Sequence, residues 1–175
     1  MAQFARPDSD VSAGSWVTAP LWQQIDESSP SDADFITGPT GLSYSACEIG
    51  LSNVTDPVSS SGHIARYRYR KNPLTTETNQ IRVTLLQGAA QIAQWEHTGI
   101  GTTFVQQDQT LSGAQADSIT DYADLRVTFE SKRTGLADPL NSGVDVSWDE
   151  FEVPDAPAAG PGPAKGSLAL MGVGR

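Results

Sequence analysis

Apolar and polar residues alternate in several short runs along this chain of 175 residues, and no long segment keeps a helical period. Each run is bounded by Gly, Pro, Ser or Asn, which favour turns. Seven runs predict strands: Tyr44–Leu51, His63–Lys71, Gln80–Leu86, Ala90–Glu96, Thr102–Gln107, Leu125–Ser131 and Val144–Val153. Strands of this number and length predict an all-β chain folded as an antiparallel sandwich of two sheets.

Three of the predicted strands have one consistently apolar face, because successive side chains of a strand point to opposite sides. The inward residues are predicted to be Ile81, Val83 and Leu85, then Leu125, Val127 and Phe129, and finally Val144, Val146 and Trp148. Burying each large side chain contributes roughly 1.5–3 kcal/mol to folding. These three strands are therefore expected to supply much of the core.

Glycine-containing breaks predict how the strands connect. Gly88 marks a tight hairpin, and residues 97–103 contain two glycines that predict another reversal, so consecutive strands are expected to pair. One helical turn is predicted over 118–125, with Ser118 as its cap and Ile119, Tyr122 and Leu125 on one side.

The chain is too short for two comfortable domains. We expect one sandwich domain over residues 1–153, with an extended, irregular N-terminal lead at 1–20, followed by a C-terminal arm at 154–175. The arm is rich in Pro, Ala and Gly and ends in an apolar tip with Leu168, Leu170, Met171 and Val173. A tip of this kind either docks on a neighbouring molecule or is a frayed terminus.

A basic ladder stands out in a chain whose formal net charge is −10. Arg66, Arg68 and Arg70 alternate with Tyr67 and Tyr69, so the pleat predicts tyrosines toward the core and arginines outside. Three roles remain open for the arginines: a face paired with acids, a contact with another protein, or binding of nucleic acid or sugar. Because acids outnumber bases by 21 to 11, the paired face is the preferred interpretation and nucleic acid the least favoured.

Residues that carry chemistry are scattered. Neither His63 nor His97 has a partner at metal-ligand spacing, and the acidic stretch 26–34 lacks the frame of a calcium loop, although oxygen ligands of that density can hold Ca²⁺. Asp149, Glu150 and Glu152 could form a catalytic carboxylate pair, but an outward strand face is the simpler interpretation. No nucleophile or phosphate-loop motif occurs, so we expect no enzyme, no cofactor and no metal.

The single cysteine, Cys47, excludes an internal disulfide and is expected to be buried. The first residues lack a signal-peptide pattern, and no apolar run is long enough to span a membrane. Synthesis in a cytoplasm is therefore expected, with no membrane partner. Of the four tryptophans, Trp95 and Trp148 are predicted in the core, while Trp16 and Trp22 lie in a less regular region and are better candidates for exposure.

Several stretches resemble a group of small virion proteins of tailed bacteriophages: WVTAPLWQQIDESSPSDADFI, LSNVTDPVSSSGHIARYRYRK, QTLSGAQADSITDYADLRVTFE, VSWDEFEVPD and GSLALMGVGR. The resemblance implies a jelly-roll-like sandwich that works as a capsid decoration or cement protein on the phage head. It also implies a homotrimer, made in the bacterial host cytoplasm, with the major capsid protein as partner and no nucleic acid. The arginine ladder and the apolar tip are then the expected contacts between subunits or with the capsid.

The alternative within this resemblance is a head-spike, fibre or tail-associated adhesion module that binds glycan on a host surface. In that case Trp16 and Trp22 are the candidates for stacking on a sugar ring. An enzyme such as a depolymerase ranks third, because only unplaced carboxylates favour it.

Overall fold

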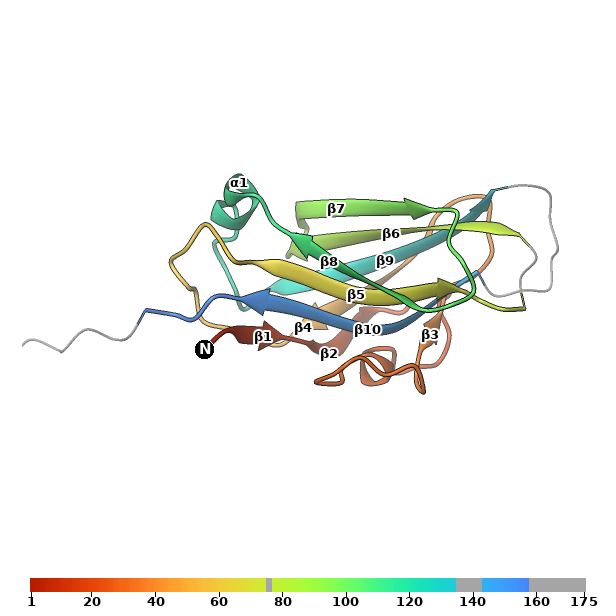
Figure 1. Ribbon diagram of the computed structural model, residues 1–175, viewed down its shortest axis with the longest axis horizontal. Helices are drawn as coiled ribbons and strands as arrows, with labels where there is room; N and C mark the ends of the chain where they lie inside the picture. Colours follow the sequence, from red (N-terminus) through yellow and green to blue (C-terminus); the bar gives the residue numbers. More distant parts are fainter. Residues whose placement is uncertain (75–76, 135–142, 158–175) are drawn as a thin grey trace, which may run out of the picture.

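The computed structural model describes residues 1–74, 77–134 and 143–157, and within them two antiparallel sheets form a sandwich (Figure 1). The elements are β1 (Gln3–Ala5), β2 (Pro7–Ser12), η1 (Trp22–Gln24), β3 (Ile36–Thr37), β4 (Ser45–Leu51), β5 (Ile64–Lys71), β6 (Thr78–Gln87), β7 (Ala90–Thr98), β8 (Val105–Thr110), α1 (Gly113–Asp117), β9 (Leu125–Thr134) and β10 (Val144–Val153). All seven predicted strands are present, with ends shifted by a few residues.

The strand order is that of a jelly roll. The first sheet runs β1-β10-β5-β8, with β3 also paired to β10, and the second runs β2-β4-β9-β6-β7. Apart from the β6–β7 hairpin, successive strands from β4 to β10 lie in opposite sheets, which is how the chain encloses one core. The expected jelly-roll-like sandwich is confirmed.

The core lies between the sheets and includes the expected inward residues of β6 and β9 and of the start of β10, together with residues of β4, β5 and the connecting segments. Tyr67 and Tyr69 are buried as predicted, at 0% and 3% exposure, and Cys47 is buried and unpaired. Gly88 has a positive φ of 54° at the β6–β7 turn, which a glycine adopts without strain.

Trp148 departs from the predicted pattern. The register of β10 against β5 shifts between Val146 and Trp148, so the extra residue Ser147 moves Trp148 to the outer face, where it pairs across from Arg68. It is still only 3% exposed, because residues from the stretch before β3 cover it and its Nε1 donates to Glu27 O at 2.7 Å.

Three local expectations are wrong. The lead at residues 1–20 is not irregular throughout, since it contains the edge strands β1 and β2, which pair with β10 and β4. The helical turn is α1, which ends before the predicted span, because Ser112 and Gln115 form a reciprocal capping box and Ser118 is the C-cap. Finally, β8 pairs with β5 and not with its predecessor β7.

Of the arm predicted at 154–175, only residues 154–157 are described, so Leu168, Leu170, Met171 and Val173 lie outside the described residues. None of the helices among the described residues has the length and hydropathy needed to cross a membrane.

Candidate functional site

The arginine ladder faces outward and meets acids of its own chain. Arg68 binds Asp32 through Nε at 2.6 Å and Nη2 at 2.7 Å, while Arg70 Nε donates to Asp145 at 2.7 Å. Arg66 forms ion pairs with Glu152, Glu150 and Asp108. The preferred interpretation of a paired outer face is therefore correct, while a role of these arginines in subunit or capsid contact stays a prediction.

The three carboxylates in the second half of β10 do not form a catalytic pair. Asp149 points inward and is 3% exposed, whereas Glu150 and Glu152 point outward to arginines. Glu150 is shared between Arg6 and Arg66, and Glu152 binds Arg66. Each acid therefore has a structural environment of its own.

No group of three or more metal-binding side chains occurs in the part of the chain that the structure describes. Within the acidic stretch 26–34, Asp32 binds Arg68, and burial is the main cause that raises the pKa of Glu27. Both histidines contact tyrosine hydroxyls instead, with His63 Nε2 at 2.8 Å from Tyr122 and His97 Nε2 at 2.7 Å from Tyr67.

The position of Trp16 contradicts the prediction from the sequence that it is exposed and stacks on a sugar ring. Trp16 is not exposed: it is 4% accessible, packs on Phe129, and its Nε1 donates to Ser45 O at 3.0 Å. Trp22 is half-buried against the core. Trp95, predicted in the core, is also only half-buried, because it lies on an edge strand of its sheet.

Two partly accessible aromatic side chains, Trp95 and His97, lie where the two sheets end side by side. Strand β7 is the last of one sheet and β8 the last of the other; in Figure 1 β7 is the uppermost strand and β8 lies lower, between β6 and β5. Trp95 and His97 on β7 and Gln107 and Gln109 on β8 occupy inward positions and are half-buried, in contrast to the inward residues of the central strands. We call this cluster the aromatic margin. Its partly accessible residues are Trp95, His97, Gln107 and Gln109, and the buried Tyr67 and Tyr69 pack against its rings.

The rings of the aromatic margin pack against one another. The ring centroid of Tyr67 is 6.1 Å from that of Trp95 and 5.7 Å from that of His97, and the Tyr69 and His97 centroids are 5.0 Å apart. The two tyrosines stack at 6.2 Å. Each side chain is thereby held by its neighbours, so the accessible edge of this surface is ordered before any ligand arrives.

Amide groups from β8 complete the aromatic margin. Gln107 Nε2 donates to the Tyr69 hydroxyl at 3.4 Å, and Gln109 hydrogen-bonds the Tyr67 hydroxyl. Both glutamines are half-buried and occupy inward positions, opposite Tyr67 and Ala65 of β5. Each amide offers donors and an acceptor in one plane, and these tyrosine contacts use only part of that capacity.

The aromatic margin carries no charge near neutral pH. Burial lowers the pKa of His97 below its usual range, so the imidazole is neutral, and burial raises the pKa of both Tyr67 and Tyr69, so the phenols keep their protons. The neighbouring acid on β7, Glu96, pairs across from Arg82 on the opposite face of the sheet. The aromatic margin therefore presents aromatic rings together with uncharged hydrogen-bond donors and acceptors.

One sequence signal could have revealed this surface. Residues 105–110 read VQQDQT, so the inward positions of β8 after Val105 are both glutamine, where a closed sandwich would have apolar residues. A strand with polar residues on both faces indicates an edge that does not seal the core. The predicted strand at 102–107 ended too early to show this alternation.

Comparisons with known proteins identify no family for the chain. No family model matches it, and no curated protein matches it either. The resemblance to phage virion proteins therefore gains no support from these comparisons.

Solved structures give distant likenesses. An arabinose-bound α-L-arabinofuranosidase, MgGH51, is 16% identical with a TM-score of 0.47, over 85% of this chain and 26% of that one, so this chain spans about a quarter of its length. The C-terminal CBM6 of LamC, a marine laminarinase from Zobellia galactanivorans, is 10% identical with a TM-score of 0.41, over 86% and 98% of the two chains. The carbohydrate-binding module CBM36, in complex with calcium and xylotriose, is 11% identical with a TM-score of 0.38, over 82% and 98%.

Two of these three neighbours are carbohydrate-binding modules and none is a virion protein. Identities and TM-scores this low transfer no ligand or activity to the present chain, so function has to be inferred from its own residues.

Proposed function

We propose that this protein is a non-catalytic glycan-binding module and that the aromatic margin is its binding surface. The observation that carries the proposal is the half-buried Trp95, held by the Tyr67 ring beside the amides of Gln107 and Gln109. A tryptophan at an unsealed margin, with polar groups converging on it, is an arrangement that favours ligand binding over core packing.

The chemistry of a sugar matches this arrangement. A pyranose ring has a face of C–H groups, which packs on an aromatic ring, and hydroxyl groups around its edge, which pair with planar amides. Because the aromatic margin is uncharged near neutral pH, a neutral glycan suits it better than an acidic one. Within the resemblance to virion proteins, this favours adhesion to a host surface over decoration of a capsid.

A glycan array probed with the wild-type protein and two variants tests the proposal. Trp95→Ala should weaken binding of the neutral glycan by about thirtyfold or more, since truncating a central tryptophan typically costs about 2 kcal/mol or more. Thr98→Ala, an exposed change on the same strand, serves as the control and should bind like the wild type. Circular dichroism establishes that both variants are folded.

Gln107→Ala provides a second variant that leaves the core untouched and removes one amide, so it should weaken binding several-fold. Absence of any glycan bound by the wild type, or binding that survives both changes undiminished, contradicts the proposed site.

The capsid-decoration role implied by the resemblance is a separate prediction, and none of the findings above supports it. Its test is deletion of residues 154–175 followed by measurement of occupancy on particles. Occupancy and particle stability that do not change would exclude the arm as an anchor.

A further inference from the structure

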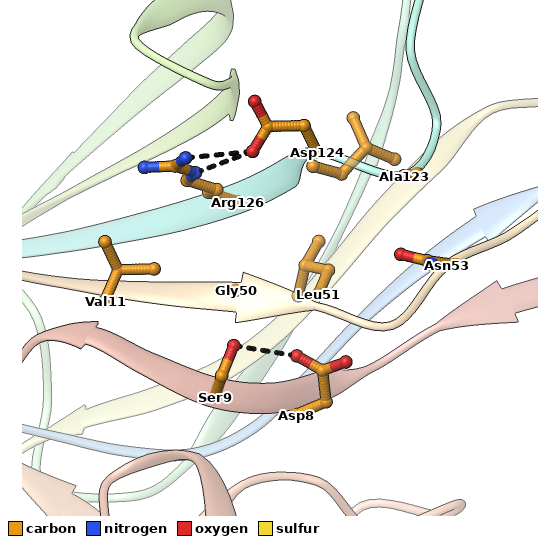
Figure 2. A pocket seen from close by; sticks show the side chains of 10 residues that line it. Asp8, Ser9, Val11, Gly50, Leu51, Asn53, Ala123, Asp124 and Arg126 are labelled. Atoms are coloured by element: carbon orange, nitrogen blue, oxygen red, sulfur yellow. Dashed lines mark hydrogen bonds and ion pairs between the residues drawn. The ribbon is translucent and has the colours of Figure 1, made fainter.

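A second surface feature lies on the outer face of the sheet β2-β4-β9-β6-β7. It is an open hollow of about 280 Å³ over strands β2, β4 and β9, far from the aromatic margin in the strand order (Figure 2). Three strand spacings separate β4 from β7, which is roughly 14 Å across the sheet. We call this feature the Gly50 hollow, after the residue at its centre.

The strand register explains why the hollow exists. Ser9 on β2, Gly50 on β4 and Arg126 on β9 are direct neighbours in one row across the sheet, so their side-chain positions share a face. Glycine in the middle of that row leaves out the side chain that would otherwise fill the space. Figure 2 shows the side chains of Asp8 and Ser9 on one side of Gly50 and those of Asp124 and Arg126 on the other.

Each side of the hollow presents an ordered set of polar groups. On one side the Ser9 hydroxyl donates to Asp8 Oδ1 at 2.9 Å. On the other side Arg126 donates to Asp124 Oδ1 from Nε at 3.1 Å and from Nη2 at 2.9 Å. The second carboxylate oxygen of Asp8 has no hydrogen bond among the described residues, so the Asp8 side retains an acceptor for a ligand. The second oxygen of Asp124 is directed toward Gly88, where an added Cβ would lie 2.8 Å from it.

The charge balance of the hollow is negative. Among the described residues that line it, Asp8 and Asp124 stand against one cation, Arg126, which binds Asp124 and also Glu48 of β4. Arg126 donates hydrogen bonds to Glu48, which is the larger cause, and to Asp124, and both raise the pKa of its guanidinium. Asp8 forms no ion pair within the described ranges, so a ligand that brings a carboxylate or sulfate of its own would be repelled.

We propose that the Gly50 hollow is a second saccharide subsite that takes one neutral sugar unit through adjacent hydroxyl groups. On one side the Asp8 carboxylate accepts hydrogen bonds from sugar hydroxyls, and on the other side the Arg126 guanidinium donates to a neighbouring hydroxyl oxygen. The subsite has no aromatic face, so it differs in chemistry from the aromatic margin. This inference rests on the proposed glycan binding, and its test separates the two.

A pair of glycine variants gives a matched test. A Cβ added at Gly50 would lie 2.4 Å from Ser9 Oγ and 3.5 Å from Asp8 Oδ1, so Gly50→Ala forces the Ser9 hydroxyl to rotate and fills the floor of the hollow. Gly50 has no positive φ, so alanine fits its backbone. A Cβ at Gly101 meets nothing within 4 Å, which makes Gly101→Ala the control.

The experiment is an NMR titration of backbone amides with the neutral methyl glycosides of glucose, galactose and mannose, and with methyl glucuronide as the acidic counterpart. We expect saturable shifts at Ser9, Gly50 and Arg126 for at least one neutral glycoside. Gly50→Ala should weaken this binding about tenfold or more, Gly101→Ala and Trp95→Ala should leave it unchanged, and the glucuronide should produce no shifts.

Asp8→Ala, at an exposed position, removes one acceptor without touching the core and should weaken the same binding several-fold, so the test does not depend on the folding of Gly50→Ala. The inference is overturned if no neutral glycoside shifts these amides or if Gly50→Ala binds as the wild type does. If shifts occur only at residues of the aromatic margin, the Gly50 subsite is overturned and the proposed function stands. If glycosides bind at the hollow but no glycan binds at Trp95, only the proposed function is overturned.

Discussion

Asp149 has an unusual position for a carboxyl group, because it points into the sandwich from the middle of β10. It is 3% exposed, and desolvation by burial, with Glu150 as a second cause, raises its pKa well above the ordinary value of 3.8. The folded protein therefore holds this proton more tightly than the unfolded chain does. Stability contributed by the protonated form is present below pH 3.8 and is lost as pH rises toward the folded-state pKa.

Asp149→Asn should remove this loss of stability with rising pH, because an amide does not ionise. Relative to the wild type, its free energy of unfolding should rise by about 1.4 kcal/mol per pH unit between the unfolded-state and folded-state pKa values and then level off. Urea unfolding across this pH range measures the trend, with Asp34→Asn at an exposed position as control. A stability difference that does not change with pH would show that the carboxyl is not protonated in the folded state.

At the residue scale, the aromatic side chains show which burial states the sequence could predict. The alternation of β5 correctly placed Tyr67 and Tyr69 inside, because one pleated strand decides it. The exposure of Trp16 and Trp95 was predicted wrongly because it depends on partners distant in sequence. Phe129 packs on Trp16, while no strand among the described residues lies beyond β7 to cover Trp95. The aromatic margin depends on which strands become edges, and a local pattern does not contain that information.

At the scale of elements, Asp145 joins three of them through its side chain. It is fully buried on β10 and accepts from Thr37 Oγ1 at 3.0 Å, Asn72 Nδ2 at 2.8 Å and Arg70 Nε at 2.7 Å. The Arg70 guanidinium also lies 4.2 Å from the centroid of the Phe104 ring. The carboxylate therefore connects β10 with β3, with β5 and with the residue that follows β5.

Asp145→Ala should destabilise the fold by about 3 kcal/mol or more, because it leaves a guanidinium and an amide without their acceptor in a buried position. Asp32→Ala breaks the neighbouring ion pair with Arg68, but Asp32 is 44% exposed, so its loss should cost about 1 kcal/mol or less. Chemical denaturation of the two variants gives the comparison. Equal losses would contradict the distinction between the buried and the exposed pair.

The sequence predicted where the strands lie along the chain but not which strands pair. Alternation and turn residues located β4 to β10 because both signals are local. The pairing of β8 with β5 was missed because the connection after β7 crosses to the other sheet, and the bulge at Ser147 was missed because it appears only in register with β5. The Gly50 hollow could not be predicted for the same reason, because it forms only when strand pairing makes Ser9 and Arg126 neighbours of Gly50.

At the scale of the whole molecule, the acidic net charge of −10 and the neutral aromatic margin predict how binding depends on salt. Ion pairs along the arginine ladder are internal, so they offer no basic surface to an acidic polymer. The affinity for a neutral glycan should therefore change less than about twofold between low and high ionic strength. Calorimetric titration measures this, and a steep loss of affinity with added salt would point to charge-driven binding elsewhere.

The central claim is that Trp95 contacts a glycan, and the four tryptophans provide an internal comparison for it. The indole N–H groups of Trp16 and Trp148 already donate to backbone carbonyls, and both rings are buried. The most direct measurement is the indole region of a ¹H–¹⁵N spectrum during titration with a neutral oligosaccharide selected on the array. A saturable shift of the Trp95 indole, with those of Trp16 and Trp148 unmoved, is the predicted result, and saturable binding that leaves the Trp95 signal in place would contradict it.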